Sequence, residues 1–268
     1  MSTSSYSTVP STSYGFRPQS PLPPPANSSN LCHSATTKTY KFFRKLFKFQ
    51  QMDFEFAMWQ CINLFVAPQK VYRNFNYRKH TKSQFARDDP AFLVLLLACM
   101  FVTSFAFGYV LHYNFWSTIV LTLYVVFVDC IFTGIIVATV VWIVANKYFR
   151  KSQMDTDIEW GYAFDVHLNA FFPPLMLLHF VLIILHGLVW DSSVRWQFHS
   201  YFLGNSLWLI AIGYYIYITF LGYNCLPHLK NTRIILFPLP LLFLFYIVSI
   251  IIGWNFAVTF IEFYKFRV

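Results

Sequence analysis

The sequence has few charged residues for its length. Asp, Glu, Lys and Arg together make up 12% of the 268 residues, whereas hydrophobic residues make up 57%. The charged share is about half that of an ordinary soluble domain. A soluble chain has no means of hiding so much apolar surface behind so few charges. The composition therefore excludes a soluble globular protein and indicates an integral membrane protein.

Cysteine is also sparse and scattered. The five residues are Cys32, Cys61, Cys99, Cys130 and Cys225, and no two of them form a CxxC pair. An odd, dispersed set argues against a disulfide framework and against a structural zinc site. Inert thiols are favoured over reversible acylation of Cys32, Cys61 or Cys225.

The motifs of common enzyme active sites are missing as well. The sequence contains no P-loop, no nucleophile elbow, no Gly-rich dinucleotide fingerprint and no HExxH. We therefore expect a non-enzymatic protein that needs no cofactor and no metal ion. The start of the chain lacks an apolar core, so we expect no cleavable signal peptide.

What the sequence does contain is a polar N-terminal third followed by long apolar runs. Residues 1–37 are rich in Ser, Thr and Pro and are predicted to form a disordered tail, and residues 38–90 form a basic region. Five apolar runs follow, each long enough to cross about 30 Å of hydrocarbon as a helix. They cover about 91–111, 117–145, 171–190, 201–222 and 236–258, before a short tail at 259–268. The predicted fold is an all-α integral membrane protein, a bundle of five transmembrane helices preceded by cytoplasmic amphipathic helices.

Lys and Arg are unevenly distributed among the segments between these runs. Twelve of the 20 precede Asp88. If the N-terminus is cytoplasmic, 17 of the 20 Lys and Arg residues lie on the cytoplasmic side and 3 on the other side. Because cytoplasmic loops of membrane proteins carry an excess of Lys and Arg, this distribution predicts a cytoplasmic N-terminus and a C-terminus in the lumen or outside.

Residues 40–66 are predicted to form one or two helices on the membrane surface. Four cations share one helical face; they are Lys41, Arg44, Lys45 and Lys48. A basic amphipathic helix of this kind lies in the headgroup layer. The apolar stretch FEFAMWQCINLFVA is too short to span the membrane, so we expect it at the interface or packed under the bundle. Membrane contact is favoured over docking of a protein.

The segment 68–87 interleaves cations with aromatic residues. Its candidate contact residues are Tyr72, Arg73, Phe75, Tyr77, Arg78, Lys79, Lys82 and Arg87. Cations that attract phosphates and aromatic rings that stack on bases are what single-stranded nucleic acid requires. The same composition serves anionic lipid or an acidic protein, and no RNA-binding fold is visible. Headgroup or partner contact is therefore favoured, with RNA binding as the alternative.

One carboxylate, Asp129, falls in the middle of the second apolar run. A charged side chain at this depth costs roughly 2.5–3.5 kcal/mol on insertion scales, so such residues are functional candidates. One interpretation is an ion or proton path with His179 and His186, which are seven residues apart and share a helical face. The favoured interpretation is helix packing through a hydrogen bond to Asn205, Ser206 or a Tyr side chain.

The connection at 155–174 gathers further titratable residues; the candidates are Asp157, Glu159, Asp165 and His167, with Asp155 beside them. An Asp and a His two residues apart are compatible with a metal site, and paired carboxylates with acid–base chemistry. No second element with ligand spacing accompanies them. An ordered cytoplasmic segment that packs on the membrane is therefore favoured over a metal site or catalysis.

Several long blocks of the sequence resemble the Unc-fifty family of multi-pass Golgi proteins. They are QQMDFEFAMWQ (50–60), PQKVYRNFNYRKHTKSQFARDDPAFLVLLL (68–97), DIEWGYAFDVHLNAFFP (157–173), GNSLWLIAIGYYIYITFLGY (204–223), LPHLKNT (226–232) and FYKFRV (263–268). The resemblance covers about 38–268, in order and with similar spacing. Two positions depart from the family pattern: Phe85 stands where Trp is expected, and His228 where an apolar aromatic residue is expected.

This resemblance implies more than the residues do by themselves. It implies five spans, a cytoplasmic N-terminus and residence in the Golgi membrane, with some members at the inner nuclear membrane. It further implies a role in trafficking and surface expression of nicotinic acetylcholine receptors, an Arf exchange factor as partner in fungal relatives, and RNA binding. No catalytic residue carries over.

Three hypotheses result. In the first, a non-enzymatic Golgi transport factor uses 38–87 and loop 146–170 to dock coat or Arf-exchange machinery, while the bundle contacts membrane lipids and cargo such as receptor subunits. In the second, 68–87 binds RNA. In the third, Asp129 serves an ion or proton transporter. The sequence leaves the oligomeric state open.

Overall fold

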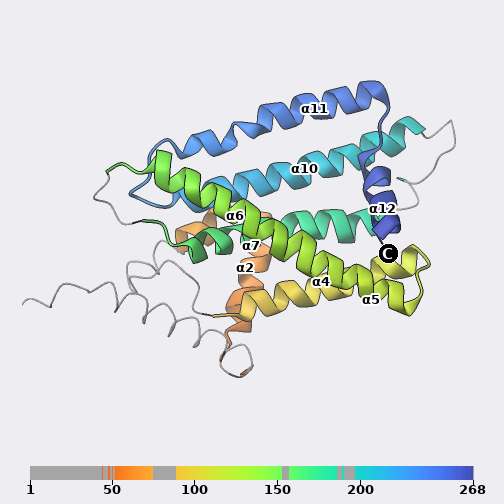
Figure 1. The fold of residues 1–268 in the computed structure, drawn as a ribbon, viewed down its shortest axis with the longest axis horizontal. Coiled ribbons are helices and arrows are strands. Elements are labelled where there is room, and N and C mark those ends of the chain that lie inside the picture. Colours follow the sequence, from red (N-terminus) through yellow and green to blue (C-terminus); the bar gives the residue numbers. More distant parts are fainter. Residues whose placement is uncertain are drawn as a thin grey trace, which may run out of the picture. The chain divides into compact units, whose positions relative to one another are not determined.

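The computed structural model describes residues 44, 48, 50, 52–74, 89–152, 157–185, 189 and 197–267 (Figure 1). The chain divides into two units, Met1–Lys41 and Phe42–Val268, and all described residues belong to the second. Within the described ranges the chain forms helices and no strand. Arg150 and Leu229 form an isolated antiparallel bridge. The predicted tail 1–37 lies outside these residues.

Five helices are long and apolar enough to cross a membrane, which confirms the predicted fold class. They cover Ala91–Val110, Phe115–Phe149, Trp160–Ile184, Phe198–Asn224 and Thr232–Ile252. Their elements are α4 (Ala91–Val110), α5 (Phe115–Tyr124), η2 (Val125–Phe132), α6 (Thr133–Val144), η3 (Ala145–Phe149), α7 (Trp160–Leu175), η4 (Met176–Val181), α8 (Leu182–Ile184), α10 (Gln197–Asn224), η5 (Thr232–Leu236) and α11 (Pro238–Ile252). The protein is therefore a multi-pass membrane protein.

The second helix is the longest, with 35 residues. The Asn114 side chain caps its start by accepting a hydrogen bond from the Ser117 N–H at 2.8 Å. Two π-helical stretches, η2 and η3, interrupt its α-helical course. A helix of this length exceeds the hydrocarbon thickness, so it has room to tilt or to extend beyond the hydrocarbon. Figure 1 shows it running obliquely to α10.

The third helix begins at Trp160, whereas the sequence predicts a loop to 170 and a span from 171. Pro173 and Pro174 consequently lie inside the helix rather than in its first turn. Proline has no N–H to donate and its ring crowds the carbonyl four residues earlier. The chain accommodates this by passing into the wider π-helical turns of η4 directly afterwards. The sequence predicts a loop here because 157–169 contains several polar residues, although 160–169 is helical.

The fifth helix ends at Ile252, before the predicted limit of 258, and the expected tail is a further helix, α12 (Phe256–Arg267). Gly253 adopts φ 75°, the left-handed conformation that suits a glycine after a helix end. The chain turns there and α12 packs against α10, burying Ala257, Ile261 and Tyr264. Figure 1 shows α12 crossing the direction of α10.

The core of the bundle lies around α7 and α10, which pack against each other, whereas α11 packs chiefly against α10 and is otherwise exposed. A short helix, α2 (Phe54–Val66), packs against α4 and α7. Its inner face is buried and consists of Ala57, Gln60, Cys61 and Leu64. Its outer face is apolar and exposed, and consists of Phe54, Met58, Ile62 and Val66. The short apolar stretch ahead of the spans thus belongs to the folded bundle.

Candidate functional site

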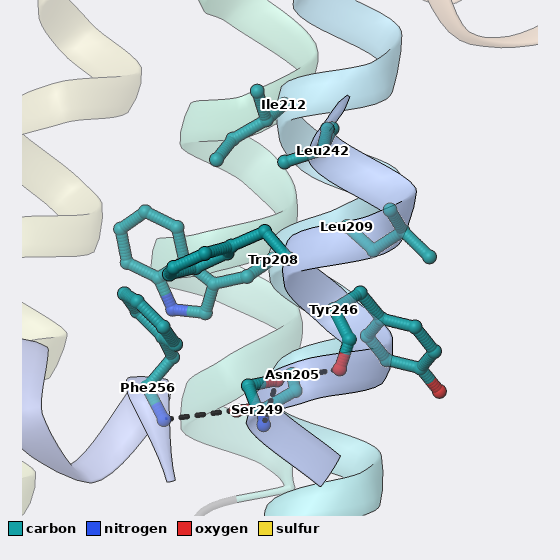
Figure 2. A pocket seen from close by; sticks show the side chains of 9 residues that line it. Asn205, Trp208, Leu209, Ile212, Leu242, Tyr246, Ser249 and Phe256 are labelled. Atoms are coloured by element: carbon teal, nitrogen blue, oxygen red, sulfur yellow. Dashed lines mark hydrogen bonds between the residues drawn. The ribbon is translucent and has the colours of Figure 1, made fainter. Parts of the chain in front are cut away.

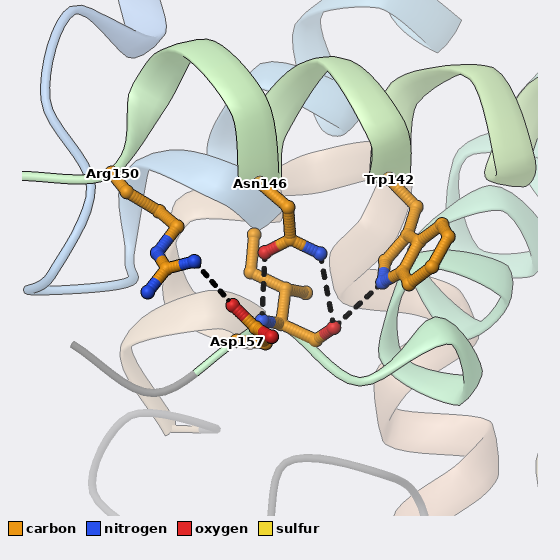
Figure 3. Close-up of polar contacts among 5 residues, drawn as sticks. Trp142, Asn146, Arg150 and Asp157 are labelled. Carbon is orange, nitrogen blue, oxygen red and sulfur yellow. Dashed lines mark hydrogen bonds and ion pairs between the residues drawn. The ribbon is translucent and has the colours of Figure 1, made fainter. Parts of the chain in front are cut away.

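One end of the bundle, here called the loop end, carries residues 146–152, 157–159 and 224–233. Its centre is the Asn146 side chain, whose amide accepts from the Ile158 N–H at 2.9 Å and donates to the Ile158 carbonyl at 3.3 Å (Figure 3). The Trp142 Nε1 donates to the same carbonyl at 2.6 Å, and Arg150 pairs with Asp157 at 2.5 Å. Trp142 and Asn146, four residues apart on one face of the second helix, hold the loop together with Arg150, which directly follows the helix.

A second set of bonds ties the connection between α10 and η5 to the same end. The Lys230 N–H donates to the Phe149 carbonyl at 2.6 Å, and the Lys151 N–H donates to the His228 carbonyl at 3.0 Å. The Tyr162 hydroxyl donates to the Gly222 carbonyl at 2.5 Å. The connection between the second and third spans and the connection between the fourth and fifth spans are therefore joined at the loop end.

The candidate metal or acid–base residues of 155–174 are not brought together. Asp157 is exposed and pairs with Arg150, Glu159 is exposed, and Asp165 is half-buried on α7. His167 is buried and faces the second and fourth spans. Among the described residues, no group of three His, Cys, Asp or Glu side chains is placed to hold a metal ion. Asp155 lies outside the described residues.

His167 connects three spans. Its Nδ1 lies 2.7 Å from the Tyr215 hydroxyl, and its Nε2 lies 3.2 Å from the Cys130 carbonyl in η2. The second helix approaches so closely because it has Gly134 there: a Cβ at this position would come within 2.5 Å of the imidazole. The π-helical turn at η2 and the glycine together give the imidazole a carbonyl partner inside the bundle.

Asp129 accepts a hydrogen bond from α12, a helix that the sequence analysis did not predict. The Tyr264 hydroxyl of α12 donates to Asp129 Oδ2 at 2.6 Å. Tyr264 is 1% exposed, and its ring lies against Phe107, Phe260 and His179. Burial raises the pKa of Tyr264 well above its usual range, and the neighbouring carboxylate raises it further. The tyrosine is therefore a neutral donor across the physiological pH range.

Among the described residues, Asp129 forms no hydrogen bond to His179 of the suggested ion path or to the packing candidates Asn205 and Ser206. His179 is buried beside Tyr264, with its Nδ1 unpaired among the described residues. His186 lies outside those residues. Ser206 contacts the Tyr246 hydroxyl of α11 at 3.0 Å, and Asn205 also faces α11. This arrangement connects helices and does not form a continuous polar path in the described part of the chain.

Asn205 holds the turn between α11 and α12. Its Nδ2 donates to Ser249 Oγ at 3.0 Å and to the Trp254 carbonyl at 2.7 Å, and its Oδ1 accepts from the Phe256 N–H at 2.8 Å. Above this amide lies a small pocket of about 80 Å³ between α10 and α11 (Figure 2). Its other lining residues are Trp208, Leu209, Ile212, Leu242, Phe245 and Tyr246. Such an apolar lining suits hydrocarbon and offers no acid–base pair for catalysis.

The basic N-terminal segments are described only in part. Arg44 and Lys48 are exposed, whereas Lys41 and Lys45 lie outside the described residues. In the segment 68–87, Arg73 is exposed, but Tyr72 is 3% exposed, so its ring has no free face for a base. The remaining candidates lie outside the described residues; they are Phe75, Tyr77, Arg78, Lys79, Lys82 and Arg87.

The sequence analysis missed the polar contacts that attach α2 to the spans. The Gln60 Nε2 donates to the Asn169 Oδ1 of α7 at 2.8 Å, and both side chains are 1% exposed. The Tyr214 hydroxyl of α10 donates to the Phe65 carbonyl at 2.5 Å. A glutamine inside an apolar stretch was the available signal, because a buried amide requires a partner.

Comparison with known proteins gives consistent matches along the chain. The model of a family described as the UNC-50 family matches residues 42–265. The chain is 64% identical over 262 residues to "Protein unc-50 homolog" of Drosophila melanogaster, covering 98% of this chain and 94% of that protein. It is 56% identical over 237 residues to "Protein unc-50 homolog A" of Xenopus laevis, covering 88% and 90%. It is 55% identical over 239 residues to "Protein unc-50 homolog" of Homo sapiens, covering 88% and 90%. No solved structure matches the chain.

Proposed function

The chain belongs to the UNC-50 family, and on this premise we propose that it is a non-enzymatic transport factor of the Golgi membrane. The family assignment confirms the Unc-fifty resemblance of its sequence blocks. In the proposed role, the protein supports transport of membrane cargo to the cell surface, with nicotinic acetylcholine receptor subunits as the cargo. Coat machinery or an Arf exchange factor is the proposed cytoplasmic partner.

The proposed topology places the loop end and α2 on the cytoplasmic side of the bundle and α12 on its lumenal side. The distribution of 17 Lys and Arg residues against 3 supports it. Attaching a glycosylation site after α12 and another before α2 tests this orientation, since only lumenal sites receive glycan. Glycan on the site before α2 would reverse the proposal.

The observation that carries the proposed role is the attachment of the pre-span region to the spans. Gln60 bonds to α7 and Gln69 to Tyr217 of α10, at 2.8 Å and 2.6 Å. A buried amide pair of this kind fixes α2 against α7, since separating the two amides inside the bundle breaks a hydrogen bond away from water. A partner that contacts the exposed Arg73, four residues after Gln69, therefore acts on a segment joined to the bundle. This coupling suits a factor that links cytoplasmic machinery to membrane cargo.

The test is rescue of cells that lack the protein. A variant with Arg73, Arg78, Lys79 and Lys82 changed to Gln removes the basic surface, and a control with Arg and Lys exchanged keeps its charge. We expect the first variant to reach the Golgi but to fail to restore surface receptor levels, and the control to restore them. Proximity labelling then identifies the neighbours lost with the charges. Normal receptor levels with the Gln variant would refute docking through this surface.

The same variants separate the alternatives. Loss of RNA crosslinking with normal receptor levels favours the RNA-binding hypothesis for 68–87. The transporter hypothesis requires Asp129→Asn to abolish a flux in liposomes while the variant stays folded. The bond from Tyr264 to Asp129 favours the packing role, because it satisfies the carboxylate within the protein.

A further inference from the structure

Three cations of the loop end have side chains with no hydrogen-bond or ion-pair partner among the described residues: Lys147, Lys230 and Arg233. All three side chains are exposed. Lys151 differs from them because its Nζ donates to the Pro227 carbonyl. The neighbouring Arg150 differs from them because it is paired with Asp157. The segments 146–152 and 225–237 contain five Lys and Arg residues and no Asp or Glu, whereas 157–159 contributes two carboxylates, Asp157, which pairs with Arg150, and the exposed Glu159. This corner of the protein therefore has a local excess of positive charge.

Backbone hydrogen bonds bring together the two segments that carry these cations. The Lys230 N–H donates to the Phe149 carbonyl and the Lys151 N–H to the His228 carbonyl, so the end of the second helix lies beside the connection to η5. Asn231 then turns the chain with φ 55°, a left-handed conformation that asparagine tolerates. The cations come from two segments far apart in the sequence and are presented together by a folded surface.

Apolar side chains surround the same cations. Tyr148, Ile234 and Phe237 are each more than half exposed, and the fifth span begins at Thr232. The Lys147 Nζ lies 5.3 Å from the centre of the Tyr148 ring. Exposed apolar groups next to cations at the end of a span are typical of the membrane–water interface, where long cationic side chains reach the headgroups.

We propose that Lys147, Lys230 and Arg233 bind the headgroup of an anionic phospholipid that carries a phosphomonoester. A phosphomonoester bears about −1.5 to −2 charges at neutral pH, so it matches a cluster of three cations better than a singly charged headgroup does. The acyl chains of this lipid lie along the exposed apolar face of α11. The neighbouring apolar side chains favour a lipid over a soluble acidic protein. Lys147 belongs to loop 146–170, but the site contains none of the four cations changed in the docking test, Arg73, Arg78, Lys79 and Lys82.

The expected effect follows from the number of cations. Each cation near an anionic lipid contributes about a fivefold gain in affinity, so removal of three lowers the affinity by about 100-fold. The full-length protein in a neutral detergent is titrated with short-chain phosphatidylinositol monophosphate, phosphatidylserine or phosphatidylcholine, and bound lipid is measured by native mass spectrometry. We expect the phosphorylated inositol lipid to bind most tightly, and the variant K147Q/K230Q/R233Q to lose that preference.

Two controls make the result specific. The variant K147R/K230R/R233K keeps the charge and is expected to bind like the parent, whereas unfolding temperature and elution volume check that each variant is folded. Equal binding by the Gln variant, or equal binding of phosphatidylcholine by the parent, overturns the proposal. Equally tight binding of the water-soluble inositol phosphate headgroup also overturns it, because the site would then recognise a free phosphate. The assay is performed in detergent, so its outcome is independent of Golgi residence, topology and receptor transport.

Discussion

Changing Tyr264 to Phe removes the hydroxyl that donates to Asp129 at 2.6 Å and leaves the ring in place. A hydrogen bond to a charged group contributes about 1.5–3 kcal/mol, and one between neutral groups about 0.5–1.5 kcal/mol. We therefore expect Tyr264→Phe to lower the free energy of unfolding by about 1–3 kcal/mol. Tyr264→Ala also removes a ring that is 1% exposed, and is expected to cost about 3–5 kcal/mol.

The assay is a double-mutant cycle with Asp129→Asn, measured as unfolding of the purified protein in mixed micelles with increasing denaturing detergent. If the two side chains interact, the double variant is less destabilised than the sum of the single variants, by about 0.5–3 kcal/mol. Additive effects within about 0.3–0.5 kcal/mol would falsify the interaction and with it the anchoring of α12 through Asp129. Flux assays on the folded Asp129→Asn variant separately test the transporter hypothesis.

Two further substitutions test the packing of the spans. Gly134→Ala places a methyl group within 2.5 Å of the His167 ring and is expected to lower the free energy of unfolding by about 1–3 kcal/mol. The control is Gly213→Ala, whose methyl group meets its nearest atom at 3.8 Å, and it is expected to leave the unfolding temperature unchanged or to raise it. Equal unfolding temperatures for the two variants would contradict the close approach. Gln60→Leu removes the amide that donates to the buried Asn169 Oδ1 and is expected to cost about 1–3 kcal/mol, with faster hydrogen exchange in 54–66. Changing both residues to Leu is expected to restore much of the loss. Unchanged exchange in the single variant would show that the amide pair does not hold α2.

The five spans could be predicted from sequence because their signal is local. Each is a run of apolar residues long enough to cross hydrocarbon, and such runs need no knowledge of their neighbours. The third span shows the limit of this reasoning. Its first turns contain Asp165, His167 and Asn169, and hydropathy assigns polar residues to a loop. In the structure, His167 and Asn169 are satisfied by partners on other helices, which no local pattern displays.

The roles of the candidate residues were also hard to predict, because their partners lie far away in the sequence. Asp129 was identified as unusual because of its position in an apolar run, but its partner Tyr264 is 135 residues away in sequence. The helix that carries this tyrosine is short and includes Glu262, Lys265 and Arg267, so it resembles a polar tail. Asn205 was noted as polar within a span, yet its role in holding the turn before α12 depends on three separate partners.

The bond between Asp129 and Tyr264 has a consequence for biosynthesis. The ribosome makes the chain from its N-terminus, so the second span enters the membrane long before Tyr264 exists. A nascent chain completed through Ile252 has all five spans, but its intramembrane carboxylate still lacks the hydroxyl donor of α12. An unpaired carboxylate at that depth is costly. Docking of α12 therefore supplies the donor that the carboxylate of the second span lacks until then, and a nascent chain interrupted before α12 keeps Asp129 without this hydrogen bond.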